Sequence, residues 1–374
     1  MLTYLTEPVL STIPFWERVS EHTSDKKIAY ISCHNAQSAL LALDQPHEAD
    51  AYLIDTSAEI WSDVSIQDFS SFTHDKIKDK PVLFLTADPL WFFKESDRYA
   101  FLPIWYYDVY YSNLNYRKSY FNPEKRYLVS CLNRAPKEHR AYNLIRMYKE
   151  GLLDHSRLLL TYKQYDPYHL DSSLQPNAEE RIIYPQSMSW SSLTSDLLSS
   201  RKTNVESIIS DIKQTYLMLF NTMPINPLNE DLTTVLDDHT VQHDAYQKSM
   251  VNLITESDIN YIFFTEKTFK ALSVGMPFWL QGKTNSILYL DLLGFDTYKD
   301  IDIFDYSTYD PCMSFIDRTD KIAAYARTVL KSNIYLDLDI SQRQLKNQEQ
   351  FYSDKTYNMF LHHLLDKIDK ILCC

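Results

Sequence analysis

Glycine is almost absent from this chain, which has four glycines among 374 residues. Three of them, Gly275, Gly282 and Gly294, lie within one stretch of twenty positions. Glycine adopts left-handed backbone conformations without strain and lets another chain segment approach closely. Because the chain avoids glycine elsewhere, this cluster of glycines predicts helix ends and tight packing in the stretch. We expect a ligand site close to it.

Short apolar runs alternate with amphipathic stretches along most of the chain. Strands are expected at 27–33, 51–55, 81–86, 126–131, 158–162, 250–255 and 277–280, and helices at 37–43, 136–150, 205–219, 266–274, 286–293, 319–330 and 339–372. Strands that alternate with helices predict parallel sheets, so the expected fold class is α/β.

The length of the chain favours two domains over one. We predict an acceptor-side α/β domain over residues 1–120 and a second α/β domain over 121–374, the latter with a polar, irregular insertion at about 163–245. The tyrosine-rich segment 106–120 is expected to be either a closing edge strand or an aromatic wall of a cleft.

Charge and cysteine content restrict the class of partner. The formal net charge of −13 argues against a nonspecific nucleic-acid-binding protein, because Lys and Arg supply most of that affinity. Five cysteines without metal-ligand spacing fit a reducing compartment, so we expect a cytoplasmic protein. No uninterrupted apolar stretch reaches the length of a membrane span, and none is predicted.

Two predicted helix starts carry cations. Arg134 lies just before the helix at 136–150. The side of this helix that we expect to face inward carries Leu144, Ile145 and Tyr148, and it continues back to Arg140 and Lys137. Helix N-termini attract anions, so these cations predict a phosphate site. A solvated basic helix end remains the alternative.

The second of these helix starts is Thr265-Glu266-Lys267. Lys267 adds a positive charge that suits a phosphate, while Glu266 offers an acceptor that suits a ribose diol. Because Glu-Lys pairs are common at helix starts, the motif is weak by itself, and its place after a strand and a polar loop strengthens it.

Metal ligands are poorly represented. Asp300 with Asp302 and Asp337 with Asp339 have the spacing of metal-binding pairs, but both lie in acidic stretches that are typical of solvated surface. We therefore predict no metal site and no resident cofactor.

Three segments together resemble the α-1,3-fucosyltransferases and related viral and bacterial glycosyltransferases of the GT-B fold. The family motif E-N-S…Y-V-T-E-K is matched by Glu256-Ser257-Asp258…Phe263-Phe264-Thr265-Glu266-Lys267, with the ten-residue interval between the two glutamates kept. The family pattern S-N…R corresponds to Ser130 through Arg140, and L-x-x-L-G-F-x-T to Leu290 through Thr297.

The resemblance implies two Rossmann-like domains that face a cleft, and a nucleotide-sugar as co-substrate. It implies that Arg140 and Lys267 hold the donor diphosphate and that Glu266 holds the ribose; Glu256, Ser257, Phe263 and Thr265 belong to the same donor-binding motif. Ser257 and Phe263 depart from the family's Asn and Tyr. The base and sugar of the donor therefore stay open.

The expected activity is metal-independent transfer of a sugar to a hydroxyl of a glycan or small-molecule acceptor. Asp88, after the strand at 81–86, is the candidate general base, because ligands of parallel sheets bind outside the carboxyl ends of strands. Two alternatives remain: a phage-type enzyme that glycosylates DNA bases, and a non-catalytic nucleotide-sugar-binding protein on the same scaffold. Duplex DNA is not expected as a partner.

Overall fold

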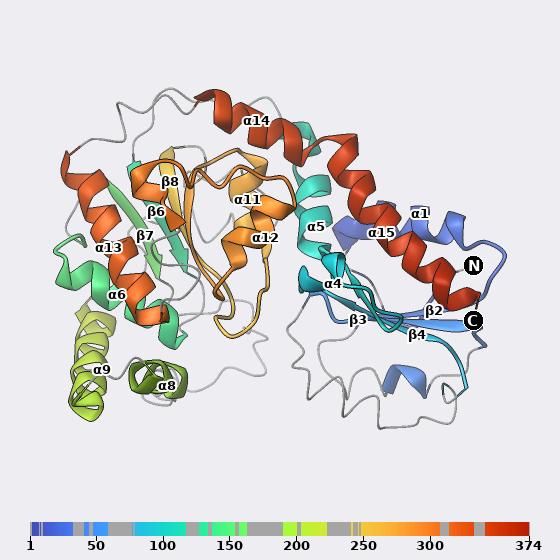
Figure 1. Cartoon of the computed structure of the whole chain (residues 1–374), viewed down its shortest axis with the longest axis horizontal. Coiled ribbons are helices and arrows are strands. Elements are labelled where there is room, and N and C mark those ends of the chain that lie inside the picture. The colour runs from blue at the N-terminus through green and yellow to red at the C-terminus, as the bar shows by residue number, and fades with distance from the viewer. Residues whose placement is uncertain are drawn as a thin grey trace.

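The computed structural model describes most of the chain. The described residues are 2–6, 8, 10–32, 41–44, 48–58, 77, 79–116, 127–133, 137–153, 157–162, 190–199, 203–222, 241, 246, 248–306, 314–332 and 341–373. They form two separate sheets, each lying in its own half of the molecule (Figure 1). All strand pairs in both sheets are parallel, which confirms the α/β class.

The first sheet has the strand order β1-β2-β3-β4-β5, so each strand pairs with the next one in the chain. Its strands are β1 (Leu2–Tyr4), β2 (Ile28–Ser32), β3 (Ala51–Asp55), β4 (Val82–Thr86) and β5 (Tyr99–Phe101). The helices of this region are α1 (Ile13–His22), α4 (Leu90–Phe93) and α5 (Ile104–Ser112), with short 3-10 turns at Leu10–Thr12 and Leu114–Tyr116.

Alternate residues of the first sheet pack into different cores. Ile28 and Tyr30 of β2 belong to the main core with Phe15 and Trp16 of α1, whereas Ala29 and Ile31 lie in a smaller cluster on the opposite face. Both sets are fully buried, as the apolar sequence of the strand predicts for a sheet covered on two sides.

The second sheet has the strand order β7-β6-β8-β9. Its strands are β6 (Tyr127–Asn133), β7 (Leu158–Tyr162), β8 (Ser249–Thr255) and β9 (Phe278–Gln281). The helices of this half are α6 (Glu138–Lys149), α8 (Ser191–Ser199), α9 (Val205–Thr222), α11 (Glu266–Ser273), α12 (Ser286–Leu292) and α13 (Phe315–Ser332), with a 3-10 turn at Asp302–Phe304.

The last two helices, α14 (Ser341–Phe351) and α15 (Asp354–Leu372), lead the chain back from the second half to the first (Figure 1). α15 contacts β4 and β5, and the buried Lys367 donates to the carbonyl of Ser96 at 2.9 Å. Residues of the predicted C-terminal domain therefore cover the first sheet. The predicted division at residue 120 itself stays a prediction.

One continuous core joins the two halves through α5. Tyr106 donates to the backbone carbonyl of Phe351 at 2.8 Å, and its ring lies 5.9 Å from that of Phe269 in α11. The predicted edge strand at 106–120 is wrong for the described part of that segment, because α5 is a helix. Its apolar residues are buried on nearly every side, so no helical stripe is visible in the sequence.

The glycine-rich stretch has the predicted structural role. Gly275 has a φ of +64° just after α11, and a side chain there would overlap the backbone carbonyl of Gln344 in α14. Positive φ and close approach together make glycine the only residue that fits. α14 can therefore pack against the end of α11 without a gap.

Two helix predictions need correction. The single helix expected at 339–372 is interrupted at Tyr352 and Ser353, where the Ser353 hydroxyl caps α15 by accepting from the Thr356 amide at 3.1 Å. The predicted insertion contains a helix that the sequence analysis missed, α8, in addition to the expected α9. α8 is short and rich in serine, which hides its periodicity.

Candidate functional site

The strand order of the second sheet reverses between β6 and β8, although these two strands run parallel. The chain leaves β6 toward β7 on one side, and it leaves β8 toward β9 on the other. Such a switch point leaves a crevice outside the carboxyl ends of the two strands, where ligands of open α/β sheets bind. At these ends, the Thr255 hydroxyl donates to the side-chain carbonyl of Asn133. The predicted donor-binding residues lie around this pair.

The first turn of α6 faces the end of β8. His139 Nε2 donates to the backbone carbonyl of Glu256 at 2.8 Å, and Lys137 Nζ donates to that of Ser257 at 2.6 Å. Arg140 is 2% exposed, and its guanidinium reaches the carbonyls of Thr255 and Glu256 at 3.5 Å. Arg140 is thus buried as predicted, whereas Lys137 is exposed, so its predicted inward position is wrong, although its ammonium bonds to the end of β8.

One member of the expected inward stripe of α6 lies elsewhere. Leu144 and Ile145 are buried, but the side chain of Tyr148 is 43% exposed, so its predicted burial is wrong. Arg134, which was expected to extend the cation group, lies outside the described residues.

Glu256 fixes the start of α11. Its buried carboxylate accepts from the Thr265 amide at 3.1 Å, from the Thr265 hydroxyl at 2.6 Å and from the Thr268 hydroxyl. Thr265 in turn caps the helix by accepting from the Lys267 amide at 3.3 Å. The geometry gives Glu256 a positioning role, because its oxygens are directed at the helix rather than at solvent. Burial raises the pKa of this carboxyl.

Glu266 and Lys267 form a partly exposed ion pair at the same helix start. Lys267 Nζ lies 2.8 Å from Glu266 Oε1, with exposed side-chain fractions of 15% and 18%. Burial acts to raise the pKa of Glu266, but the charges of Lys267 and Lys270, together with hydrogen bonds to the Lys267 side chain and to the Glu266 backbone, outweigh it and lower that pKa to about 2. Glu266 is therefore a permanent hydrogen-bond acceptor at neutral pH.

Three cations from the two helix starts lie around His139; we call Lys137, Arg140 and Lys267 the cation cluster. Burial and, after it, the charges of the three cations lower the pKa of His139 to about 3. The imidazole is therefore neutral, and the positive potential at this edge of the sheet comes from the cluster. Two helix N-termini add their dipoles to that potential.

The two residues that depart from the family motif have different surroundings. Phe263 is 7% exposed and so offers little surface to a ligand. Ser257 is half-buried, and its carbonyl holds Lys137. The geometry thus links Ser257 to the cation cluster through its backbone.

Asp88 lies at the end of the first half that faces the second. Its carboxylate accepts from the Leu90 amide at 2.9 Å, which holds the start of α4. The pKa of Tyr289 in α12 is raised first by burial and second by the negative charge of Asp88. The two side chains are therefore neighbours. The rings of Tyr289 and Phe93 lie 5.9 Å apart.

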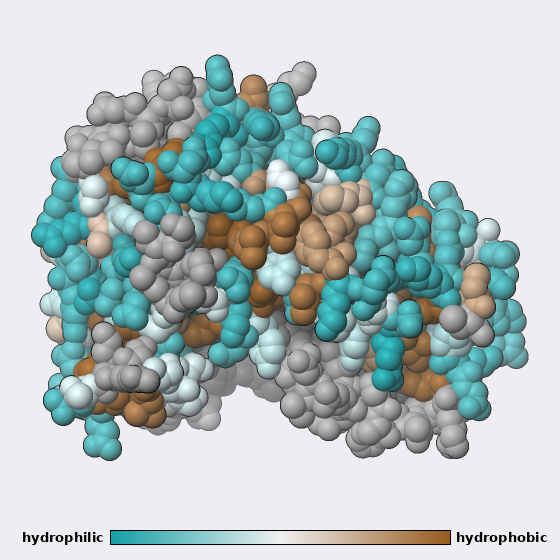
Figure 2. All heavy atoms as spheres, viewed as in Figure 1, coloured by the Kyte–Doolittle hydropathy of each residue, from teal (hydrophilic) through white to brown (hydrophobic). Residues whose placement is uncertain are grey.

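Apolar side chains are exposed around this junction. Figure 2 shows hydrophobic residues in the middle of this face of the molecule, over α12 and α4. Phe93, Leu288 and Leu292 are 45%, 50% and 55% exposed. Asp88 therefore borders an apolar surface at the junction of the two halves.

A second carboxylate at the edge of the first sheet was missed in the sequence. Asp55, at the end of β3, is 3% exposed and accepts from Tyr30 Oη at 2.5 Å and from the Ser57 amide at 2.8 Å. The same signal that singled out Asp88, an aspartate at a strand end, was available for Asp55.

Within the described ranges, no three His, Cys, Asp or Glu side chains lie together as metal ligands. Asp300 pairs with Arg343 at 2.7 Å, while Asp337 and Asp339 lie outside those ranges. Metal-independent chemistry stays a prediction. In the same residues, no helix is long and apolar enough to cross a membrane.

No family model, curated protein or solved structure matches this chain.

Proposed function

We propose that this protein is a GT-B glycosyltransferase whose nucleotide-sugar donor binds at the carboxyl edge of the second sheet. The observation that carries the proposal is the cation cluster, which two helix N-termini bring to a topological switch point. A nucleoside diphosphate carries its charge on adjacent phosphates, and such anions bind where amide dipoles and cations converge.

Different residues around the cluster bind different parts of the donor. Lys137, Arg140 and Lys267 face the diphosphate, and the ionised Glu266 accepts hydrogen bonds from the ribose hydroxyls. Ser257 and Phe263 replace the family's Asn and Tyr, so the proposal leaves the base and the sugar open. Glu256 acts on the donor through the position of α11.

In the transfer step, the bond between the anomeric carbon and the diphosphate oxygen breaks while the acceptor oxygen bonds to that carbon. The acceptor hydroxyl proton passes to Asp88, the candidate base at the facing edge of the first half. The diphosphate leaves with its negative charge stabilised by the cation cluster. A glycan or small molecule with a hydroxyl is the acceptor class.

The first experiment is a thermal-shift panel of GDP-, UDP-, CMP- and dTDP-sugars with the full chain. We expect one nucleoside diphosphate sugar to raise the melting temperature, because a ligand that binds only the folded state stabilises it. Release of nucleoside diphosphate from that donor, unaffected by EDTA, would support an enzyme. Binding without release would favour the non-catalytic alternative, and the absence of any binding would contradict the proposal.

A further inference from the structure

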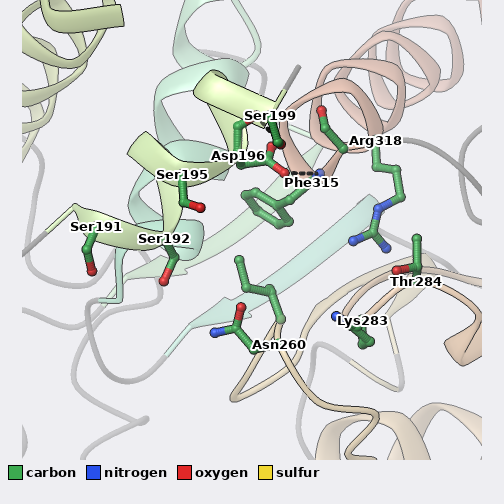
Figure 3. Close-up of a pocket in the computed structure, with 12 residues that line it drawn as sticks. Ser191, Ser192, Ser195, Asp196, Ser199, Asn260, Lys283, Thr284, Phe315 and Arg318 are labelled. Carbon is green, nitrogen blue, oxygen red and sulfur yellow. Dashed lines mark hydrogen bonds between the residues drawn. The ribbon is translucent and has the colours of Figure 1, made fainter. Parts of the chain in front are cut away.

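A cavity of about 430 Å³ lies beside the carboxyl edge of the second sheet, between α8, the start of α13 and the loops that follow β8 and β9 (Figure 3). No member of the cation cluster lines it. Its volume falls in the range of small-molecule sites. The cavity therefore offers room for a second ligand group outside the proposed donor diphosphate site.

Two cations reach this cavity from different elements. Arg318 extends from α13 and is 5% exposed, and Lys283 lies on the loop after β9. Figure 3 shows the Arg318 guanidinium reaching toward the loop that carries Lys283 and Thr284. In the part of the chain that the structure describes, the Lys283 ammonium has no hydrogen bond and no ion pair. A half-buried ammonium of this kind is available to an anion.

The carboxylate that lines the cavity is directed elsewhere. Asp196 accepts from the backbone amides of Phe315 at 3.2 Å and Ile316 at 3.0 Å, so it caps the first turn of α13. A carboxylate at a helix N-terminus is stabilised there by the amide groups and the helix dipole. The Lys283 ammonium therefore meets an anionic ligand without competition from an ion pair with Asp196.

The remaining wall suits a hydroxylated ring. α8 contributes four serines to the cavity, and Thr284 adds a fifth hydroxyl, while the Phe315 ring provides an apolar surface (Figure 3). α8 is held against α6, because the Glu138 carboxylate accepts from the amides of Ser192 and Leu193 at 3.1 Å each. The serine wall is thus fixed by the same helix that supplies Lys137 and Arg140.

We propose that this cavity binds a sugar that carries an oxyanion, either a carboxylate or a phosphate. Lys283 and Arg318 hold the oxyanion, the serine and threonine hydroxyls bond the ring hydroxyls, and Phe315 packs on the apolar face of the ring. The inference does not depend on the donor assignment, since the two sites share no residue.

The test is titration calorimetry of the full chain with glucuronate, glucose 6-phosphate, glucose and inorganic phosphate at one ionic strength. Both charged sugars should bind more tightly than glucose or phosphate alone, and the tighter of the two identifies the source of the oxyanion. Lys283→Ala should weaken their binding roughly tenfold or more, because it removes a charge-assisted bond. Ser195→Trp, at an exposed position of α8, should block the cavity without loss of the fold.

Lys331→Ala, at an exposed position near the far end of α13, is the matched control and should bind as the wild type does. Lys267→Ala should also leave these sugars bound, since its expected effect is on nucleoside diphosphates. Equal binding of glucose and the charged sugars, equal binding of phosphate and glucose 6-phosphate, or wild-type affinity in both cavity variants would each overturn the proposal.

Discussion

The two halves of this protein contain parallel sheets of similar size but different connectivity. In the first sheet every strand pairs with the next in the chain. In the second sheet the strand order reverses between β6 and β8. Polar groups at the edge of the first sheet bond one another, as Asp55 does with Tyr30 and Ser57. At the reversal of strand order in the second sheet, Thr255 and Asn133 also bond one another, but two helix N-termini bring three cations there as well. Connectivity, more than composition, thus decides which sheet edge has the electrostatics of an anion site.

The largest expected effect is a loss of stability when either of two buried carboxylates, Glu256 or Asp55, is removed. Replacement of either by Ala leaves buried hydroxyl and amide donors without their acceptor, which costs roughly 1–3 kcal/mol per donor in the free energy of unfolding. Thermal and urea unfolding should therefore show both variants to be strongly destabilised.

Conservative variants of Glu256 and Asp55 separate an effect on nucleotide binding from an effect on stability. Glu256→Gln keeps the shape of the side chain, so the fold should survive while nucleotide affinity drops as α11 shifts. Asp55→Asn should leave nucleotide affinity unchanged. Equal losses of affinity in both variants would break the distinction between the two sheets.

The next effect is on binding. Lys267→Ala should weaken nucleoside diphosphate binding on the order of tenfold or more, because one charge-assisted bond is lost. Lys94, which lies over the Trp91 ring in the first half, is the matched cation, and Lys94→Ala should bind normally. Calorimetry on the two variants checks this, and a loss at Lys94 alone would move the anion site to the first sheet.

A smaller effect concerns the ribose. Since Glu266 is ionised at neutral pH, the wild type should prefer a ribonucleoside diphosphate to its 2′-deoxy form by several-fold. Glu266→Gln removes the charge and should reduce that preference, with little change in melting temperature. Competition titrations measure the ratio directly. An unfolded Glu266→Gln variant would mean that the residue serves the helix instead.

The smallest effect is a pH dependence. The pKa of His139 is about 3 in the folded chain against 6.5 for a free imidazole, so the unfolded chain takes up the proton first as pH falls. Stability present above pH 6.5 is thus lost on acidification, by about 1 kcal/mol between pH 7 and 5.5 for one such group. His139→Gln should flatten the urea-unfolding profile over this range.

His363 on α15 provides the comparison in the first half, because burial lowers its pKa to about 4. His363→Gln should flatten the same profile in the same direction. The positive charges near His363 come from Lys367 and Lys370, and only His139 lies in the cation cluster, so a bound nucleoside diphosphate should change the profile difference at His139 and leave that at His363 unaltered. An equal change at both positions would argue against a local site.

Strong periodicity made much of the fold predictable from the sequence. The apolar runs at 51–55 and 158–162 are β3 and β7, and Arg140 is buried as the helical stripe required, although Lys137 is exposed. α5 escaped prediction because a helix that is apolar all round shows no stripe. The return of α15 to the first sheet also escaped, since tertiary packing across the whole chain leaves no local pattern.

The candidate site was predictable only in part. Residue type and spacing identified Lys137, Arg140, Glu266 and Lys267, but the positioning role of Glu256 depends on three hydrogen bonds that the sequence does not display. The neutral His139 at the centre of the cation cluster was likewise invisible, because its pKa follows first from burial, which the sequence does not display, and then from the charges of Arg140, Lys137 and Lys267.

Hydrogen–deuterium exchange of the full chain tests the central claim most directly, with and without the nucleoside diphosphate that gives the largest thermal shift. The account predicts slower exchange at amides of 137–141 and 255–268, where the two helix starts meet at the reversal of the second sheet. It predicts no change at Ser32 or at 55–57, the carboxyl edge of the first sheet. Slower exchange at the first sheet edge, with none at the two helix starts, would contradict it.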